Sequence, residues 1–172
     1  MRSAERGSGQ GDDRPRIVVG VDGFESSMAA LRWAIHQAKL TGAVVEAVTA
    51  WHVPAGTSQV PAADRPDYAE DARTVLAEAI MQAHTTGTEV EVRSRVMAGP
   101  AAQVLVDAVE GADLLVVGCQ GHGGTAGAQP ESTGPESTGP ESTGPESAGL
   151  GSVGEFCAHN APCPVVIMRG KR

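Results

Sequence analysis

Five apolar runs, separated by stretches of helical periodicity, organise the chain. The runs are Ile17–Val21, Val44–Trp51, Val90–Met97, Leu114–Val117 and Val165–Met168. Between them, apolar residues recur at the spacing of one helix face. These residues are Met28, Leu31, Ile35 and Ala38; Ala72, Val75, Leu76, Ala79, Ile80 and Ala83; and Ala101, Val104, Leu105 and Ala108. Strands that alternate with helices predict a three-layer α/β fold, with a parallel sheet covered on both faces.

Residues with known preferences for helix ends mark the boundaries of these segments. Glu25 and Ser26 lie where the first helix should begin, and Gly42 where it should end. Gly87 is expected to end the second helix. Gly99-Pro100 opens the third, since Pro suits a first turn, and Gly111 closes it. A fourth helix is expected to begin near residues 151–152.

The strand patterns distinguish central strands from edge strands. The run 90–97 alternates apolar residues with the charged residues Glu89, Glu91, Arg93 and Arg95, which is typical of an edge strand. The runs at 17–19 and 114–117 are unbroken, as central strands should be. Val165–Met168 is also unbroken, so at an edge it would need a cover, for which a partner subunit is the simplest candidate.

A five-residue unit repeated in tandem interrupts the pattern at residues 130–149, which read PESTG three times and then PESAG. Its composition cannot form a core and predicts a disordered insert. The polar, Gly-rich residues 1–14 predict a disordered tail without the apolar segment of a signal peptide. We therefore expect a single domain over residues 15–170.

Charge and composition exclude several classes of partner. The net charge is −8, and the four glutamates of the repeat account for half of it. No basic stripe stands out and aromatic residues are scarce, so nucleic acid is not an expected partner. No apolar run is long enough to span a membrane. The odd, low cysteine count fits the reducing cytoplasm, with each cysteine a small buried hydrophobe.

Asp22 follows the first strand at its carboxyl end. In doubly wound sheets, ligands bind outside the carboxyl ends of the strands, where the winding reverses. A carboxylate at this position can accept hydrogen bonds from an amine or hydroxyl of a ligand. Two structural roles compete equally with that function: an acid that interacts with the helix dipole, and a turn residue.

A glycine-rich loop follows the fourth strand. Removing the repeat joins Gly118, Gly121 and Gly151-Ser152 in the spacing G-x2-G-x9-G-S. Glycines allow backbone N–H groups to approach a phosphate closely, and a helix beginning near Ser152 would add its dipole. The Ser152 hydroxyl can donate to a phosphate, cap the helix, or do both. The chain has no GxxxxGK[ST] motif, no metal-ligand spacing and no GxSxG elbow.

Together these residues resemble the universal stress proteins of the UspA-like family. The similarity is carried by RIVVGVDGFESSMAALRWA, by the segment 96–100, and by ADLLVVGCQGHGG followed by LGSVGEFCAHNAPCPVVIMR. The spacing G-x2-G-x9-G-[ST] resembles the ATP-binding branch. The resemblance implies a doubly wound sheet of order 3-2-1-4-5, like the adenine nucleotide alpha hydrolases, and homodimers formed through Val165–Met168.

The resemblance also implies a binding site for ATP, alone or with Mg²⁺. Asp22 and the backbone at Ala50 would contact adenine, while Val117 and Gly118 would lie against the ribose. Gly121, Gly151, Ser152 and Val153 would hold the phosphates. The family implies a regulator of the stress response with at most slow ATP hydrolysis and no catalytic residue.

The repeat lengthens the spacer of this loop from nine residues to 29. The added closure entropy is about 1 kcal/mol, which folding tolerates. Ordering the loop and placing four carboxylates near an anionic ligand both reduce affinity, so we expect weakened ATP binding. The alternatives are a nucleotide-free interaction module with a flexible acidic arm and, less favoured, a redox sensor at Cys119.

Overall fold

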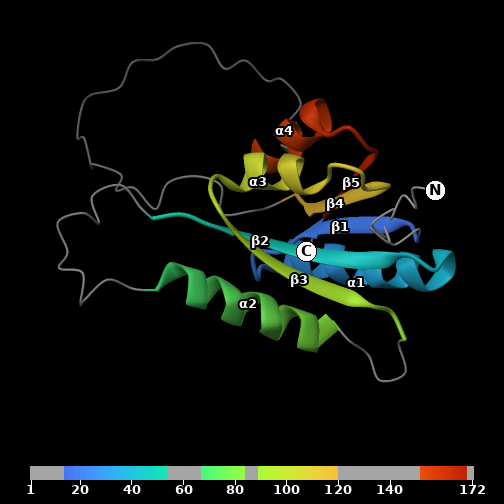
Figure 1. Cartoon of the computed structure of the whole chain (residues 1–172), viewed down its shortest axis with the longest axis horizontal. Coiled ribbons are helices and arrows are strands. Elements are labelled where there is room, and N and C mark those ends of the chain that lie inside the picture. The colour runs from blue at the N-terminus through green and yellow to red at the C-terminus, as the bar shows by residue number, and fades with distance from the viewer. Residues whose placement is uncertain (1–13, 54–66, 84–88, 120–151, 170–172) are drawn as a thin grey trace, which may run out of the picture.

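The computed structural model describes residues 14–53, 67–83, 89–119 and 152–169. Strands and helices alternate in these ranges in the predicted order (Figure 1). The elements are β1 (Arg16–Gly20), α1 (Glu25–Thr41), β2 (Val44–Trp51), α2 (Tyr68–Ala83), β3 (Val92–Ala98), α3 (Ala101–Ala108), β4 (Leu114–Gly118), α4 (Ser152–Asn160) and β5 (Val165–Met168). The predicted tail and repeat lie outside the described residues.

The five strands form one parallel sheet in the order β3-β2-β1-β4-β5, which confirms the predicted fold class. The chain winds outward from β1 to β3 and then returns to place β4 on the other side of β1. β1 and β4 are therefore the point where the winding reverses. Ile17 lies opposite Leu114, and Val19 lies opposite Val116.

Each face of the sheet carries its own hydrophobic core. On the first face, α1 and α2 pack over alternate strand residues that include Ile17, Val19 and Val45. On the second face, α3 packs with residues of α4 over Val18, Leu115 and Val117. These two helix pairs lie on opposite sides of the sheet in Figure 1. The alternation along β1 explains the unbroken apolar run, because both faces of a central strand are buried.

Small residues bring α1 close to the sheet. Ala30, Ala34 and Ala38 are all buried along one stripe of the helix, so its backbone approaches the strands closely. The helix begins at Glu25 and ends before Gly42, as predicted. Gly42 has a φ of 71°, a left-handed conformation that glycine adopts without steric cost, and its N–H donates to the carbonyl of Ala38.

Several predicted boundaries and positions were wrong in detail. β1 ends at Gly20, and β3 covers 92–98 rather than 90–97. Val75 was expected on the buried face of α2 but is 36% exposed, because Leu76 and Ala79 occupy the inward stripe. Pro100 lies one residue before α3, at its N-cap. α2 ends at Ala83, and Gly87 lies outside the described residues.

The two edges of the sheet differ in polarity. Along β3, Arg93, Ser94 and Arg95 are exposed, which confirms the predicted edge strand. Along β5, all four apolar residues are only half-buried. None of the helices in the described ranges is long and apolar enough to cross a membrane.

Candidate functional site

The carboxyl ends of β1 and β4 bring several predicted site residues to one edge of the sheet. Asp22 follows β1, and Gly118 is the last residue of β4. The Val21 N–H donates to the carbonyl of Val48 at 2.9 Å, so the ladder between β1 and β2 continues one residue past β1. This continuation places Asp22 close to the level of Ala50 on β2. Helices α1 and α4 lie on opposite faces of the sheet, and in doubly wound sheets ligands generally bind where the winding reverses.

Hydrogen bonds fix the backbone of the loop after β1. Oγ1 of Thr49, a buried residue of β2, donates to the carbonyl of Val21 at 2.9 Å. The Ser27 hydroxyl donates to the carbonyl of Phe24 at 2.9 Å and accepts from the N–H of Asp22 at 3.3 Å. The segment from β1 to the first turn of α1 is therefore held in one conformation on both sides of Asp22.

Asp22 itself performs the turn role that was one of its predicted alternatives. Its Oδ1 accepts the N–H of Phe24 at 3.0 Å, and Gly23 between them has a φ of 82°. The Asp22 side chain is exposed. A carboxylate has about four acceptor positions, so the turn bond leaves acceptor capacity directed toward solvent. The turn role and a ligand-binding role are thus compatible in one residue.

Gly118 packs directly against the start of α1. A methyl group added at Gly118 would lie 2.7 Å from Oγ of Ser26 and 2.8 Å from the backbone N of Ser27. Both serines are buried. The absence of a side chain at Gly118 therefore lets β4 and α1 meet at the point where the winding reverses. In this structure its first role is helix–strand packing.

Val117 and Ala50 present little side chain to a ligand. Val117 is only 2% exposed and belongs to the second core, while Ala50 is half-buried against the same core. Contact with a ligand at these two positions would have to use the backbone, as the resemblance implied for Ala50. The side chain of Val117 packs in the second hydrophobic core.

Helix α4 begins at Ser152, which agrees with the expected position of the fourth helix. Ser152 is exposed, whereas Val153 is half-buried and packs against the second core. The first N–H groups of a helix lack intrahelical acceptors and carry the positive end of its dipole. Gly121 and Gly151, the other predicted phosphate residues, lie outside the described residues.

The three cysteines are in their free form. Cys157 is buried, as predicted, whereas Cys119 and Cys163 are only half-buried. Burial raises the pKa of the Cys157 thiol to about 11 and also raises the pKa of Cys163. Cys119 continues the strand pairing, since its N–H donates to the carbonyl of Met168 at 2.8 Å. No group of metal-ligating side chains is found among the described residues.

Sequence reasoning missed the residues that fix the loop after β1. Thr49 lies inside an apolar run, where a single hydroxyl gives no signal of its partner. Ser27 follows the predicted helix start, and a serine at the start of a helix is a known capping signal. Its hydroxyl instead bonds to Asp22 and Phe24 in the preceding turn. The position of Ser27 could suggest such a contact, but the sequence does not identify its partners.

The sheet order defines a doubly wound α/β domain in which the winding reverses between β1 and β4. The sequence matches the Universal stress protein family over residues 14–169. The chain therefore belongs to the universal stress protein family.

Curated relatives and solved structures agree with this family. Universal stress protein Rv2624c of Mycobacterium tuberculosis is 30% identical over 168 residues, which cover 95% of this chain and 52% of that protein. The chain thus spans about half the length of the curated relatives it matches.

Two solved structures share the fold over nearly their whole length. Universal stress protein UspA from Lactobacillus plantarum has a TM-score of 0.64 at 18% identity, covering 90% of this chain and 97% of its own. A universal stress protein in complex with cAMP has a TM-score of 0.61 at 25% identity, covering 91% and 98%.

Proposed function

We propose that this universal stress protein binds an adenine nucleotide, ATP alone or with Mg²⁺, in the crevice between β1 and β4, and acts as a regulator of the stress response. The observation that carries the proposal is the position of Asp22, Gly118 and Ser152 around the point where the winding reverses. The similar protein solved with cAMP supports an adenine nucleotide as the ligand class.

The described residues fit such a ligand. The exposed carboxylate of Asp22 is positioned to accept from an exocyclic amine, and the loop that carries it is fixed by Thr49 and Ser27. The amino end of α4, with the Ser152 hydroxyl, would hold phosphate oxygens. Gly121, Gly151 and Val153 complete the proposed phosphate site, while the backbones of Ala50, Val117 and Gly118 would line the base and ribose positions.

We also propose that the repeat at 130–149 weakens nucleotide binding. It adds 20 residues and four carboxylates between Gly121 and Gly151. When a nucleotide binds, this segment must become ordered, and the entropy cost of ordering it lowers the affinity for the nucleotide. The protein would then respond to ATP only at high concentration. Residues 15–170 would form one cytoplasmic domain that pairs with a second copy through β5.

Asp22→Asn separates the two roles of Asp22. The amide oxygen of Asn can keep the turn bond to the Phe24 N–H, while the negative charge is lost. Charge-assisted hydrogen bonds contribute about 1.5–3 kcal/mol, so we expect ATP affinity to fall about tenfold or more. Glu78→Gln, which removes an exposed acid from the middle of α2, serves as the charge-matched control.

The measurement is an NMR titration of each variant with ATP. In the native chain, amide shifts should concentrate at Asp22, Gly118, Ser152 and Val153. Asp22→Asn should weaken the response and Glu78→Gln should not. The proposal fails if ATP leaves these amides unchanged at millimolar concentration. That outcome, with no ATP in the purified protein, would favour the nucleotide-free interaction module.

A further inference from the structure

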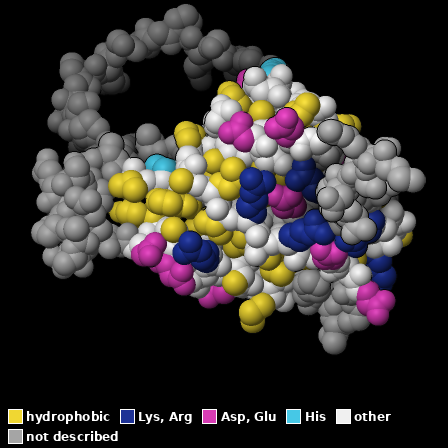
Figure 2. Space-filling view, viewed as in Figure 1, with side chains coloured by type: hydrophobic (Ala, Val, Ile, Leu, Met, Phe, Trp, Pro, Cys, Tyr) yellow, Lys and Arg dark blue, Asp and Glu magenta, His cyan; other side chains and the backbone are white. Residues whose placement is uncertain are grey.

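The second face of the sheet divides into a charged half and an apolar half. Arg16, Glu46 and Arg95 lie on this face toward the amino ends of β1, β2 and β3. Ala50 and Met97 follow on the same face toward the carboxyl ends, and both pack against the second core. Figure 2 shows hydrophobic side chains gathered to the left of most of the Lys and Arg side chains, on the side where β2 and β3 end in Figure 1.

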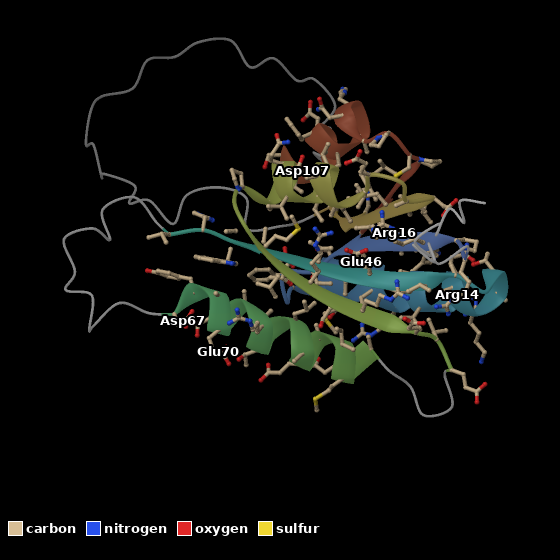
Figure 3. All side chains as sticks on the ribbon, in the orientation of Figure 1. Arg14, Arg16, Glu46, Asp67, Glu70 and Asp107 are labelled. Atoms are coloured by element: carbon tan, nitrogen blue, oxygen red, sulfur yellow. The ribbon has the colours of Figure 1, made fainter. Side chains whose placement is uncertain are left out.

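The charged half is closed by ion pairs and does not extend to Met97. The buried Glu46 carboxylate accepts from Arg16 at 2.6 Å and from Arg95 at 3.1 Å. Figure 3 shows Arg16 and Glu46 reaching toward each other from β1 and β2. Glu46 lies opposite Arg93, two residues nearer the amino end of β3 than Arg95. The Arg95 guanidinium is therefore bonded in the direction away from Met97, and the carboxyl half of this face presents apolar side chains.

The strand register places Met97, Ala50 and Asp22 in one row across β3, β2 and β1. Ala50 lies directly opposite Met97. The Gly99 N–H donates to the carbonyl of Trp51 at 2.8 Å, so β2 and β3 stay paired beyond this position. On the other side of β2, the pairing with β1 brings Asp22 close to the level of Ala50. Strand pairing therefore fixes the spacing of the three positions.

Helix α3 covers the second face only as far as the preceding row. A methyl group added at Gly20 would lie 2.9 Å from Cδ1 of Leu105 on α3, and Val48 beside Gly20 is fully buried in the same core. Ala50 is two residues further along β2 and is only half-buried, as is Met97. A planar ligand can therefore contact this row from the solvent side.

The spacing across the row favours a two-ring base. Neighbouring strands lie about 4.8 Å apart, so the strands that carry Asp22 and Met97 are separated by roughly 10 Å. A base whose exocyclic amine donates to the Asp22 carboxylate would lie over the small side chain of Ala50. A purine extends further along the row than a pyrimidine does, and so it reaches Met97. The flexible thioether of a methionine makes favourable contacts with aromatic rings.

We propose that Met97 makes the nucleotide site select a purine over a pyrimidine. The inference rests on the proposed function, since it requires the base to be held at Asp22. Adenine and cytosine both carry an exocyclic amine, so the carboxylate of Asp22 accepts from either and does not distinguish them. Contact with Met97 is available only to the larger base. Met97 is thus a specificity-determining residue that acts on the base and not on the phosphates.

The test compares ATP with CTP in NMR titrations of the native chain carrying isotope-labelled methionine methyl groups. ATP should shift the Met97 methyl signal together with the amides of Asp22 and Ser152, and it should bind several-fold more tightly than CTP. CTP should shift the two amides and leave the Met97 methyl in place. The methyl of Met81, which is 76% exposed on α2, is the internal control and should not move with either nucleotide.

Met97→Ala and Met81→Ala form a matched pair of variants, because both remove the same side-chain atoms. Met97→Ala should lower ATP affinity about two- to tenfold, the range of a sulfur–aromatic contact, and leave CTP affinity unchanged. Met81→Ala should change neither affinity. Met97→Leu, which keeps an apolar side chain of similar volume, should retain most of the preference for ATP. The ratio of the two affinities within one variant does not depend on the fraction that is folded.

Two results would overturn the inference while leaving nucleotide binding intact. One is an ATP titration that shifts the amides of Asp22 and Ser152 but not the methyl of Met97. The other is a ratio of ATP to CTP affinity that is one in the native chain, or that is the same in Met97→Ala as in the native chain. If ATP shifts none of these signals at millimolar concentration, the proposed function fails and the inference fails with it.

Discussion

At the scale of single residues, the buried thiol of Cys157 shows how the fold controls reactivity. The side chain is fully buried in the second core, and burial raises its pKa to about 11. Only the thiolate is nucleophilic, so a raised pKa suppresses reaction. Because the folded-state pKa lies above the ordinary thiol value of 9.0, the thiol reduces stability only at pH values above about 9.

We expect Cys157 to resist alkylation by iodoacetamide at pH 8 in the folded protein and to react at once in urea. Peptide mass spectrometry after timed labelling measures this difference, with the half-buried Cys119 as the internal control. Labelling of Cys157 at the same rate as Cys119 in the folded state would contradict the account.

Gly118→Ala tests the close contact between β4 and α1. The new methyl group would meet the backbone of Ser26 and Ser27 at 2.8 Å, and backbone cannot rotate away. Overpacking of this kind costs about 1–3 kcal/mol, so the free energy of unfolding should fall by that amount. Urea denaturation followed by circular dichroism measures it.

Gly20→Ala is the matched control at the end of β1. Its methyl group would lie 2.9 Å from Cδ1 of Leu105, the far end of a flexible side chain that can shift. We expect a smaller loss than for Gly118→Ala. If the two variants were equally stable, rigid helix–strand contact would not be the reason for glycine at position 118.

At the scale of elements, the order and type of every strand and helix in the described ranges could be predicted from the sequence. Apolar runs and helical periodicity carry this information because burial depends directly on side-chain type. The exposure of Val75 could not be predicted, since Val75 and Leu76 are both apolar neighbours and packing alone decides which faces inward. The bonds of Thr49 and Glu46 depend on partners from other strands, which periodicity does not encode.

The candidate site was predictable only in part. Asp22 was identified from its place after the first strand and Gly118 from the motif spacing, and the sheet brings both to the point where the winding reverses. The turn bond of Asp22 and the packing of Gly118 against Ser26 are tertiary details. The pairing of Arg16 and Arg95 with Glu46 was not predicted, because these residues come from three different strands.

The β5 edge is the element through which we expect two copies to pair. The carbonyls of Pro164 and Met168 accept from β4, so in a parallel ladder the main-chain groups of Val165 and Ile167 point to the open side. Val165→Pro removes one outward N–H, and proline is tolerated where an edge strand faces solvent. Light scattering after size-exclusion chromatography should show a dimer for the native chain and a monomer for this variant.

Val165→Ala is the control, because it removes most of the same side chain but keeps the N–H. It should remain dimeric. A native chain that stays monomeric at about 100 μM, far above a micromolar Kd, or a Val165→Pro variant as dimeric as Val165→Ala, would contradict pairing through β5.

At the scale of the whole molecule, the two ends of the sheet carry different chemistry. The carboxyl end holds the fixed loop of Asp22 and the start of α4, which suit a nucleotide. The amino end holds Arg16 and Arg95, which are both paired with the buried Glu46. The chain spans about half the length of its curated relatives.

The most direct measurement of the central claim is isothermal titration of ATP into the native chain and into a version lacking 130–149. We predict binding at one site per chain in both, with several-fold higher affinity in the shortened version, because its spacer returns to nine residues and loses four carboxylates. Equal, tight affinity in both would contradict a weakening role for the repeat. Absence of binding in both would contradict the adenine-nucleotide function itself.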